Sequence, residues 1–263
     1  MTAITTRTSP RQPASATFVP VVAAFVVAVV AWKAIVVIGG YPPFILPAPE
    51  TVATRLVKGW TDGTILPHFV ATATEVALGL AVGAALALVA GYGLARSAFV
   101  ERVVSPYLVA AQATPILALA PLLALWFGAG LLSKVVICAL IVFFPVAVST
   151  MVGVRSVDVG LLELARSLRA TRRQILTTLE VPGALPSILG GMRVGVTLAV
   201  VGAIVGEWAG AERGLGVLIN VARGSLFDIP LMFATLVTIA ILGIALYLVV
   251  VLVERRLLGP RQP

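Results

Sequence analysis

The chain has 263 residues, of which 60% are hydrophobic and 11% are charged, and its net charge is +8. Because a soluble domain carries about 25% charged and about 45–50% apolar residues, this composition excludes an ordinary soluble enzyme and a disordered chain. A single Cys and a single His exclude an intrachain disulfide and argue against a metal site built from Cys or His.

Six stretches of the chain are long and apolar enough to cross a membrane as helices, since a bilayer core about 30 Å thick requires about 20 apolar residues. They cover residues 18–38, 69–95, 103–127, 131–154, 188–208 and 229–253. These runs are longer and more continuous than the alternating strands of a membrane barrel, and helices satisfy their own backbone hydrogen bonds in lipid. We therefore expect an all-α, polytopic membrane protein with about six transmembrane helices.

The distribution of basic residues predicts the orientation of these helices. If the N-terminus is inside, the outer segments hold only Arg55, Lys58, Arg213 and Arg223, and the inner segments hold most of the arginines. The positive-inside rule then places both termini in the cytoplasm. The same bias accounts for the net charge, so no nucleic-acid partner is needed to explain it.

The expected organisation follows from these spans. It comprises a disordered cytoplasmic tail at 1–17, a first transmembrane helix at 18–38, an outside linker at 39–68, a five-helix core at 69–253 with a cytoplasmic loop at 155–187, and a cytoplasmic tail at 254–263. A cleaved signal peptide is the alternative for the N-terminus, but its apolar run exceeds the usual length of about 7–15 residues. In the linker, Val52, Leu56 and Trp60 recur every four residues, which predicts a short amphipathic helix at 50–60 lying on the surface.

Small residues form a stripe in the second predicted helix. Gly79, Gly83, Ala87 and Gly91 recur every four residues and so lie on one helical face. Such a face lets another helix approach closely, which predicts a packing seam. The alternative is that the stripe only reflects the general abundance of Ala and Gly.

The inner loop at 155–187 is much longer than a simple connection. Its apolar residues have spacings compatible with one helical face: Leu161, Leu164, Leu168, Ile175 and Leu179. We expect the helical stretch to end at Val181-Pro182, because a residue before Pro disfavours helical geometry. A helix of this kind either lies on the membrane surface, held by anionic lipid, or docks into a groove on a partner.

Short motifs in and around this loop resemble the permease subunits of binding-protein-dependent ABC importers. Those that look like the family's "EAA" loop are Glu163-Leu164-Ala165, Ala170, Val181-Pro182-Gly183-Ala184-Leu185-Pro186 and Gly190-Gly191-Met192-Arg193. Other matching stretches include Leu46-Pro47-Ala48-Pro49, Phe143-Phe144-Pro145, Gly206-Glu207-Trp208 and Gly214-Leu215-Gly216. Two positions depart from the pattern, since Leu164 replaces an Ala and Arg169 replaces a Gly that permits a turn between two short helices.

The resemblance implies a set of partners in a bacterial plasma membrane. A second permease subunit, expected to be another copy of this chain, would complete the solute pathway. ABC ATPase subunits would bind the inner face, and an extracytoplasmic solute-binding protein would deliver the solute.

The resemblance also assigns roles within the ATPase-coupling loop. Glu163 would be a polar anchor, and Leu164, Ala165 and Leu168 would be docking contacts; a carboxylate favoured by a helix start is the alternative for Glu163. Arg169, Ala170, Pro182 and Pro186 complete the loop. Its arginines would contact either the ATPase or lipid phosphates.

The sequence offers no catalytic machinery of its own. None of its lysines (Lys33, Lys58 and Lys134) follows Gly, so it has no phosphate-binding loop, and the ATP must be hydrolysed by a partner. No nucleophile–base pair supports a membrane enzyme. We expect a transport subunit without cofactor or metal.

Ionisable groups within membrane spans are candidates for function. Glu75 lies early in the second span, and Glu207 lies at the outer end of the fifth, so both are candidates for the pathway or its outer gate. Gln112 and Pro115 are candidate pathway residues in the third span.

Two questions remain open from the sequence. An ion-coupled secondary transporter is the less favoured alternative, because it calls for ionisable groups near mid-membrane and, commonly, inverted repeats. For the substrate, the stretch 206–219 resembles importers of riboflavin or pyrimidine vitamin precursors more than those of sulfonate, taurine or nitrate.

Overall fold

The computed structural model describes residues 14–113 and 115–259, and this part of the chain contains helices but no strand. In chain order the helices are α1 (Ala14–Gly39), α2 (Pro49–Thr61), α3 (Leu66–Arg96), α4 (Ala98–Ala113), α5 (Ile116–Phe127), α6 (Leu131–Arg155), α7 (Val159–Ser167), α8 (Arg172–Ile175), η1 (Leu176–Glu180), α9 (Val181–Trp208), α10 (Leu215–Arg223) and α11 (Ile229–Leu258). Among these residues, five helical stretches are long and apolar enough to cross a membrane, and Ala118–Phe127 is a shorter apolar helix. The predicted all-α, polytopic architecture is confirmed.

The third predicted span differs from expectation. Instead of one helix over 103–127, the chain forms α4 and α5, and α5 begins after Pro115, which has an extended backbone (ψ 102°). Proline removes a backbone hydrogen bond and keeps the preceding residue out of helical geometry, which explains a break there. Pro106 and Pro121 lie inside α4 and α5 without breaking them.

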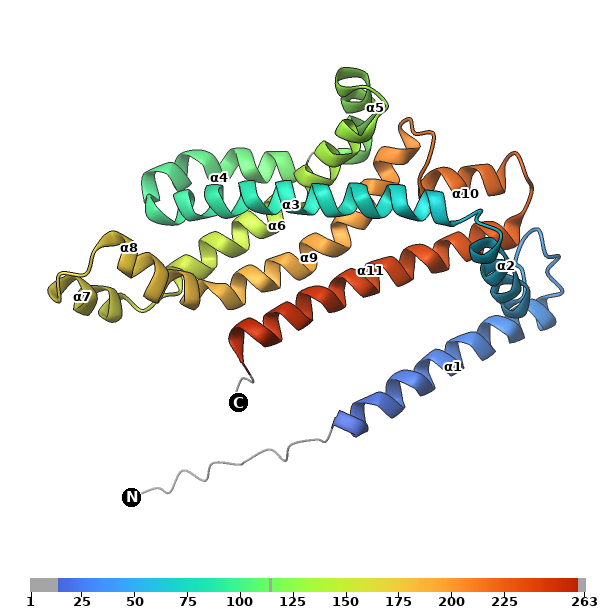
Figure 1. The fold of residues 1–263 in the computed structure, drawn as a ribbon, viewed down its shortest axis with the longest axis horizontal. Helices are drawn as coiled ribbons and strands as arrows, with labels where there is room; N and C mark the ends of the chain where they lie inside the picture. Colours follow the sequence, from blue (N-terminus) through green and yellow to red (C-terminus); the bar gives the residue numbers. More distant parts are fainter. Residues whose placement is uncertain (1–13, 114, 260–263) are drawn as a thin grey trace.

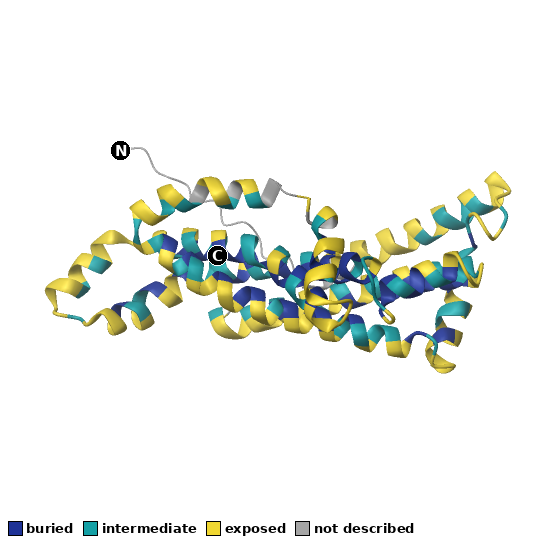
Figure 2. Cartoon of the chain, turned by 90° about the horizontal axis from the view of Figure 1, so that it is seen from above, coloured by how far each residue is buried: buried dark blue, intermediate teal, exposed yellow. Residues whose placement is uncertain are grey.

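The core consists of three long helices, α3, α6 and α9, which pack on one another and hold most of the buried residues. Figure 2 shows the buried residues gathered along the middle of the bundle. The small-residue stripe of α3 faces α6 closely. A Cβ added to Gly83 would lie 2.6 Å from the carbonyl oxygen of Ala139, and one added to Gly91 would press on Ala147. Ala87 is fully buried in the same cluster. Side chains at the two glycines would therefore force α3 and α6 apart.

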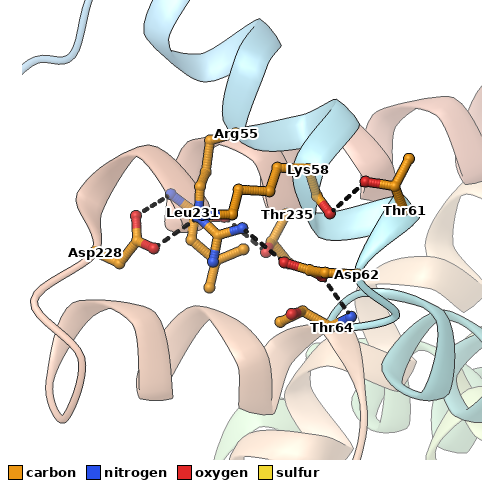
Figure 3. A network of polar contacts seen from close by, with 8 residues as sticks. All are labelled: Arg55, Lys58, Thr61, Asp62, Thr64, Asp228, Leu231 and Thr235. Carbon is orange, nitrogen blue, oxygen red and sulfur yellow. Dashed lines mark hydrogen bonds and ion pairs between the residues drawn. The ribbon is translucent and has the colours of Figure 1, made fainter.

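A polar network joins α2 to the start of α11 (Figure 3). The Arg55 guanidinium donates from Nε to Asp228 Oδ2 at 2.7 Å, and Asp228 caps α11 by accepting from the backbone N–H of Leu231 at 2.9 Å. The pKa of Asp62 is lowered most by a hydrogen bond from the Thr64 hydroxyl and next by one from the Thr64 backbone N–H. The Asp62 carboxylate lies 3.8 Å from Nη1 of Arg55. The lowered pKa favours the charged form of Asp62 opposite the guanidinium.

α1 flanks the bundle instead of joining its core (Figure 1). Its Phe25 and Val30 are exposed. The ring of Trp32 stacks on Phe233 of α11 with centroids 5.9 Å apart, and Lys33 pairs with Glu50 of α2. This surface suits a helix surrounded by lipid.

The bundle has two distinct ends (Figure 1). α7 and α8 lie at one end, toward which the start of α1 and the end of α11 also point. α2 and α10 lie at the opposite end. The two ends carry the two groups of candidate residues described next.

Candidate functional site

The first group centres on α7, a nine-residue helix that projects from one end of the bundle. Asp158 begins it by accepting hydrogen bonds from the backbone N–H groups of Gly160 (2.6 Å) and Leu161 (3.3 Å). Leu161 and Leu164 on the helix and Leu168 at its end are 50%, 55% and 75% exposed. α7 therefore presents large apolar side chains that nothing in the described chain covers.

The turn after α7 forms despite the Arg that replaces the family's Gly. The N–H of Ala170 donates to the carbonyl of Ala165, and that of Arg169 donates to Arg166, both at 2.9 Å, which is the Schellman arrangement of a helix end. Arg169 has φ +56°, a left-handed conformation that glycine adopts without strain. The expected single apolar face over 161–179 is therefore wrong, because the turn separates α7 from Ile175, which is buried against the bundle.

The chain continues from this turn into the membrane as one helical path. Thr171 and Gln174 form a capping box at the start of α8, and the π-helical turn η1 leads directly into α9. The predicted helix end at Val181-Pro182 is wrong, since Val181 is helical (φ −63°, ψ −51°) and Pro182 lies in the first turn of α9. The turn before it is π-helical, with the N–H of Val181 bonded to the carbonyl of Leu176, and this changed hydrogen-bond pattern lets the helix pass Pro182, which has no N–H to donate.

A buried carboxylate fixes this path to α3. Glu180 is 2% exposed and accepts from Tyr92 at 3.1 Å, while Arg96 Nη1 lies 3.1 Å from its other oxygen. Arg96 also donates from Nε to the Tyr92 hydroxyl at 2.8 Å. No sequence pattern predicts this triad, and its only signal is an acidic residue next to a predicted span.

The remaining coupling-loop residues lie around the same turn. Ala165, Arg169 and Ala170 line a cavity of about 390 Å³ between α7 and the start of the long helical path, while Glu163 is exposed on α7. Pro186 lies inside α9, one turn after Pro182, and is half-buried.

The second group lies at the opposite end and centres on Glu207. Its carboxylate is 2% exposed and accepts from the Thr72 hydroxyl (2.5 Å) and from the backbone N–H of Gly216 (2.5 Å). Thr72 in turn accepts from the N–H of Leu215 at 2.8 Å. Glu207 thus holds the loop before α10 against α3.

His68 supports the same loop from the start of α3. Its Nδ1 lies 2.8 Å from the carbonyl oxygen and 3.1 Å from the backbone nitrogen of Gly214. Gly214 has φ +144°, and a Cβ there would overlap the carboxyl group of Glu207. Only glycine fits at this position without disturbing the carboxylate.

Glu75 lies beside this group and faces a cavity of about 810 Å³. It is 4% exposed, and its Oε2 has no hydrogen-bond partner. Lys134 lines the same cavity and donates to the backbone carbonyls of Ala129 (2.5 Å) and Gly130 (3.0 Å). Glu75 is therefore the candidate carboxylate that a solute in this cavity would meet.

The structure describes the two candidate residues of the third predicted span in less detail. Pro115 is exposed at the start of α5, and the backbone of Gln112 lies in α4. The side chain of Gln112 lies outside the described part of the structure. At the α7 end, Arg193 pairs with Glu254 of α11.

The fold and these two ends define an integral membrane transport component built to work with other subunits. Residues 79–259 match the family described as "Binding-protein-dependent transport system inner membrane component", and the chain belongs to this family. It is thus a non-catalytic ABC importer permease subunit of the inner membrane, as its motifs indicated. Importers of this family combine such permeases with separate ATPase subunits and binding proteins.

Several curated relatives are similar over most of their length. The riboflavin transport permease RibX of Chloroflexus aurantiacus is 43% identical over 86% of this chain and 84% of its own. The formylaminopyrimidine transport permease ThiX of Halalkalibacterium halodurans is 39% identical over 77% and 80%. The taurine transport permease TauC of Escherichia coli is 32% identical over 86% and 84%.

A solved structure supports the fold. The inward-facing MetNI methionine ABC transporter aligns with a TM-score of 0.66 at 20% identity, covering 73% of this chain and 95% of that one.

Proposed function

We propose that two copies of this chain form the solute pathway of an ABC importer and that α7 docks onto the ATPase subunits at the cytoplasmic side. The observation that carries this proposal is the exposed apolar surface of α7, made by Leu161, Leu164 and Leu168. A soluble partner with a groove would bury these side chains. In this arrangement Leu164, Ala165 and Leu168 are the docking contacts and Glu163 is the polar anchor.

The contacts behind α7 suit the transmission of a rigid-body movement. A tight Schellman turn joins α7 to α8, α8 continues through η1 into α9 as one helical path, and Glu180 links that path to Arg96 of α3. A push on α7 would therefore move α9 and α3 together. Such coupled movement between two discrete arrangements is how packed helices switch state.

The docking proposal is tested with Leu164→Asp. We expect this variant to lose co-purification of the ATPase subunits and ATP-driven uptake, because a charge would be buried in an apolar interface. Leu226→Asp is the matched control, since Leu226 is 56% exposed but lies at the opposite end of the bundle, and it should keep the ATPase. Retention of the ATPase by Leu164→Asp would refute the docking role.

The energy source separates this function from an ion-coupled secondary transporter. Uptake should stop when ATP is depleted and persist for a time when the proton gradient alone is collapsed. The opposite pattern would support the secondary transporter.

We propose riboflavin or a pyrimidine vitamin precursor as the solute. The proposal is supported by 43% identity to RibX and 39% to ThiX, against 32% to TauC. Titration of riboflavin, formylaminopyrimidine and taurine into the partner solute-binding protein tests it by calorimetry. Binding of taurine or a sulfonate alone would favour the alternative importer class.

We place the outer part of the pathway at the cavity beside Glu75. Two observations support this placement: Glu75 lines the cavity, and its buried Oε2 has no hydrogen-bond partner among the described residues. Pro115 and Gln112 remain candidate pathway residues, and Glu207 supports the loop before α10, a candidate part of the outer gate.

A further inference from the structure

A second cavity lies at the α7 end of the bundle and is lined mainly by arginines. It has a volume of about 590 Å³ and lies between the end of α3 and the α7–α8 segment. Arg96 and Tyr92 contribute from α3, Arg166 from α7, and Arg172 and Arg173 from α8. No acidic residue lines it. We call it the arginine pocket.

The positive charge of this pocket is largely uncompensated within the described chain. Arg96 is paired with Glu180, but Arg166, Arg172 and Arg173 have no ion pair or side-chain hydrogen bond to any described residue. All three are exposed. Guanidinium groups gathered without a counter-ion repel one another, and each can donate two parallel hydrogen bonds to a phosphate. The pocket is therefore suited to an anion with several acceptor oxygens.

The geometry of α7 separates this pocket from the proposed docking face. Arg166 follows Leu161 by five residues and Leu164 by two, which places it roughly 140–160° around the helix from both. A partner that covers the leucines would thus leave Arg166 on the side turned toward the bundle. The arginine pocket needs an occupant of its own.

The surroundings of the pocket favour a lipid over a soluble anion. Tyr92 and Arg96 lie in the last two turns of a membrane-spanning helix, where side chains meet lipid headgroups. Ile175 and Leu176 add apolar surface to the wall. Basic pockets between helix ends on the cytoplasmic side are suited to anionic headgroups, whose chains remain in the bilayer.

We propose that the arginine pocket binds the phosphate headgroup of an anionic phospholipid and so holds the α7–α8 segment against the membrane. The proposal rests on the cytoplasmic placement of α7 described above, but not on which partner docks there. A bound lipid would join α3, α7 and α8 through one set of charge-assisted hydrogen bonds.

The test measures lipid binding to the purified permease–ATPase complex in nanodiscs of phosphatidylcholine with increasing phosphatidylglycerol. Native mass spectrometry should find phosphatidylglycerol retained in preference to phosphatidylcholine. Each basic residue near a membrane surface contributes about 1 kcal/mol, or about fivefold in affinity, so Arg166→Gln/Arg172→Gln/Arg173→Gln should bind roughly a hundredfold more weakly. The matched control is Arg255→Gln/Arg256→Gln, which removes exposed arginines from the last turn of α11 and should keep the retained lipid.

Three results would overturn the proposal. The triple variant could retain phosphatidylglycerol as wild type does, inorganic phosphate at millimolar concentration could displace the lipid fully, or the assembled complex could bind no phosphatidylglycerol selectively. If the triple variant does not assemble, Arg172→Gln alone should lose about fivefold in affinity, and an unchanged affinity would count against the pocket. Co-purification of the ATPase is scored separately, so a failure of docking is distinguishable from a failure of lipid binding.

Discussion

Two buried acidic residues, Glu207 and Glu75, have different roles at the end of the bundle where α10 lies. Glu207 accepts two hydrogen bonds at 2.5 Å, whereas one oxygen of Glu75 accepts none. A carboxylate that satisfies buried donors is needed by the fold, and one that lines a cavity with an unpartnered oxygen is a candidate for binding a ligand. The two residues look equivalent in sequence, because both are acidic groups near the ends of spans.

Glu207→Gln should therefore destabilise the protein more than Glu75→Gln. The amide introduced at position 207 accepts with only one atom, so it cannot keep the hydrogen bonds from both Thr72 and Gly216, and the loss of one of them costs about 1–3 kcal/mol. Thermal unfolding of the purified variants in one detergent measures the difference. Uptake should fall in Glu75→Gln at near-normal stability, and equal losses of stability in both variants would contradict this division of roles.

The left-handed conformation of Arg169 makes a second prediction at residue scale. Arg169→Gly should raise the stability of the α7 turn relative to Arg169→Ala by about 1 kcal/mol, because both remove the guanidinium but only glycine relieves the strain of a positive φ. Hydrogen exchange of the backbone N–H groups of residues 169 and 170 measures it. Slower exchange in the Ala variant than in the Gly variant would contradict the strain argument.

At the scale of helices, the seam between α3 and α6 depends on the absence of side chains. Gly83→Val should force the two helices apart, because its Cβ would lie 2.6 Å from the carbonyl oxygen of Ala139 and the backbone there cannot yield. We expect a loss of about 3 kcal/mol or more and poor expression. Gly93→Val is the matched control on the same helix, since nothing lies within 4 Å of a Cβ there, and it should express normally. Comparable loss in both variants would indicate a propensity effect instead of a packing effect.

The helices were predictable from sequence where length and hydropathy decide them, and less so where neighbours decide. The long apolar runs in α3, α6, α9 and α11 gave an unambiguous signal. The prolines gave no such signal, because Pro121 and Pro186 lie inside helices, whereas the helix is broken at Pro115 before α5. Whether a proline breaks a helix depends on which groups satisfy the freed carbonyls, and those lie elsewhere in the chain.

The candidate sites were likewise predictable only where their signal is local in sequence. The α7 loop could be located because its motifs are local in sequence. The pairing of Glu180 with Tyr92 joins residues 88 positions apart, and that of Glu207 with Thr72 joins residues 135 apart. No local pattern encodes such pairings, so the sequence marked Glu207 as a candidate for the pathway or its outer gate but could not predict its hydrogen bonds with Thr72 and Gly216.

At the scale of the whole molecule, the two ends of the bundle must face different compartments. The arginine pocket and the exposed apolar surface of α7 lie at one end, and the Glu207 loop lies at the other (Figure 1). The positive-inside rule predicts that the α7 end faces the cytoplasm. Docking of an ATPase and delivery by a binding protein both depend on this orientation.

Labelling with a membrane-impermeant maleimide tests the orientation directly. The native Cys138 is fully buried and should not react, so an added cysteine reports alone. In right-side-out membrane vesicles, Ser225→Cys, an exposed position between α10 and α11, should react, and Ser167→Cys, exposed at the end of α7, should not. Both should react after permeabilisation, which controls for accessibility. Reaction of Ser167→Cys in sealed vesicles would place α7 outside, where no cytoplasmic ATPase could reach Leu164, and would remove the basis of the coupling proposal.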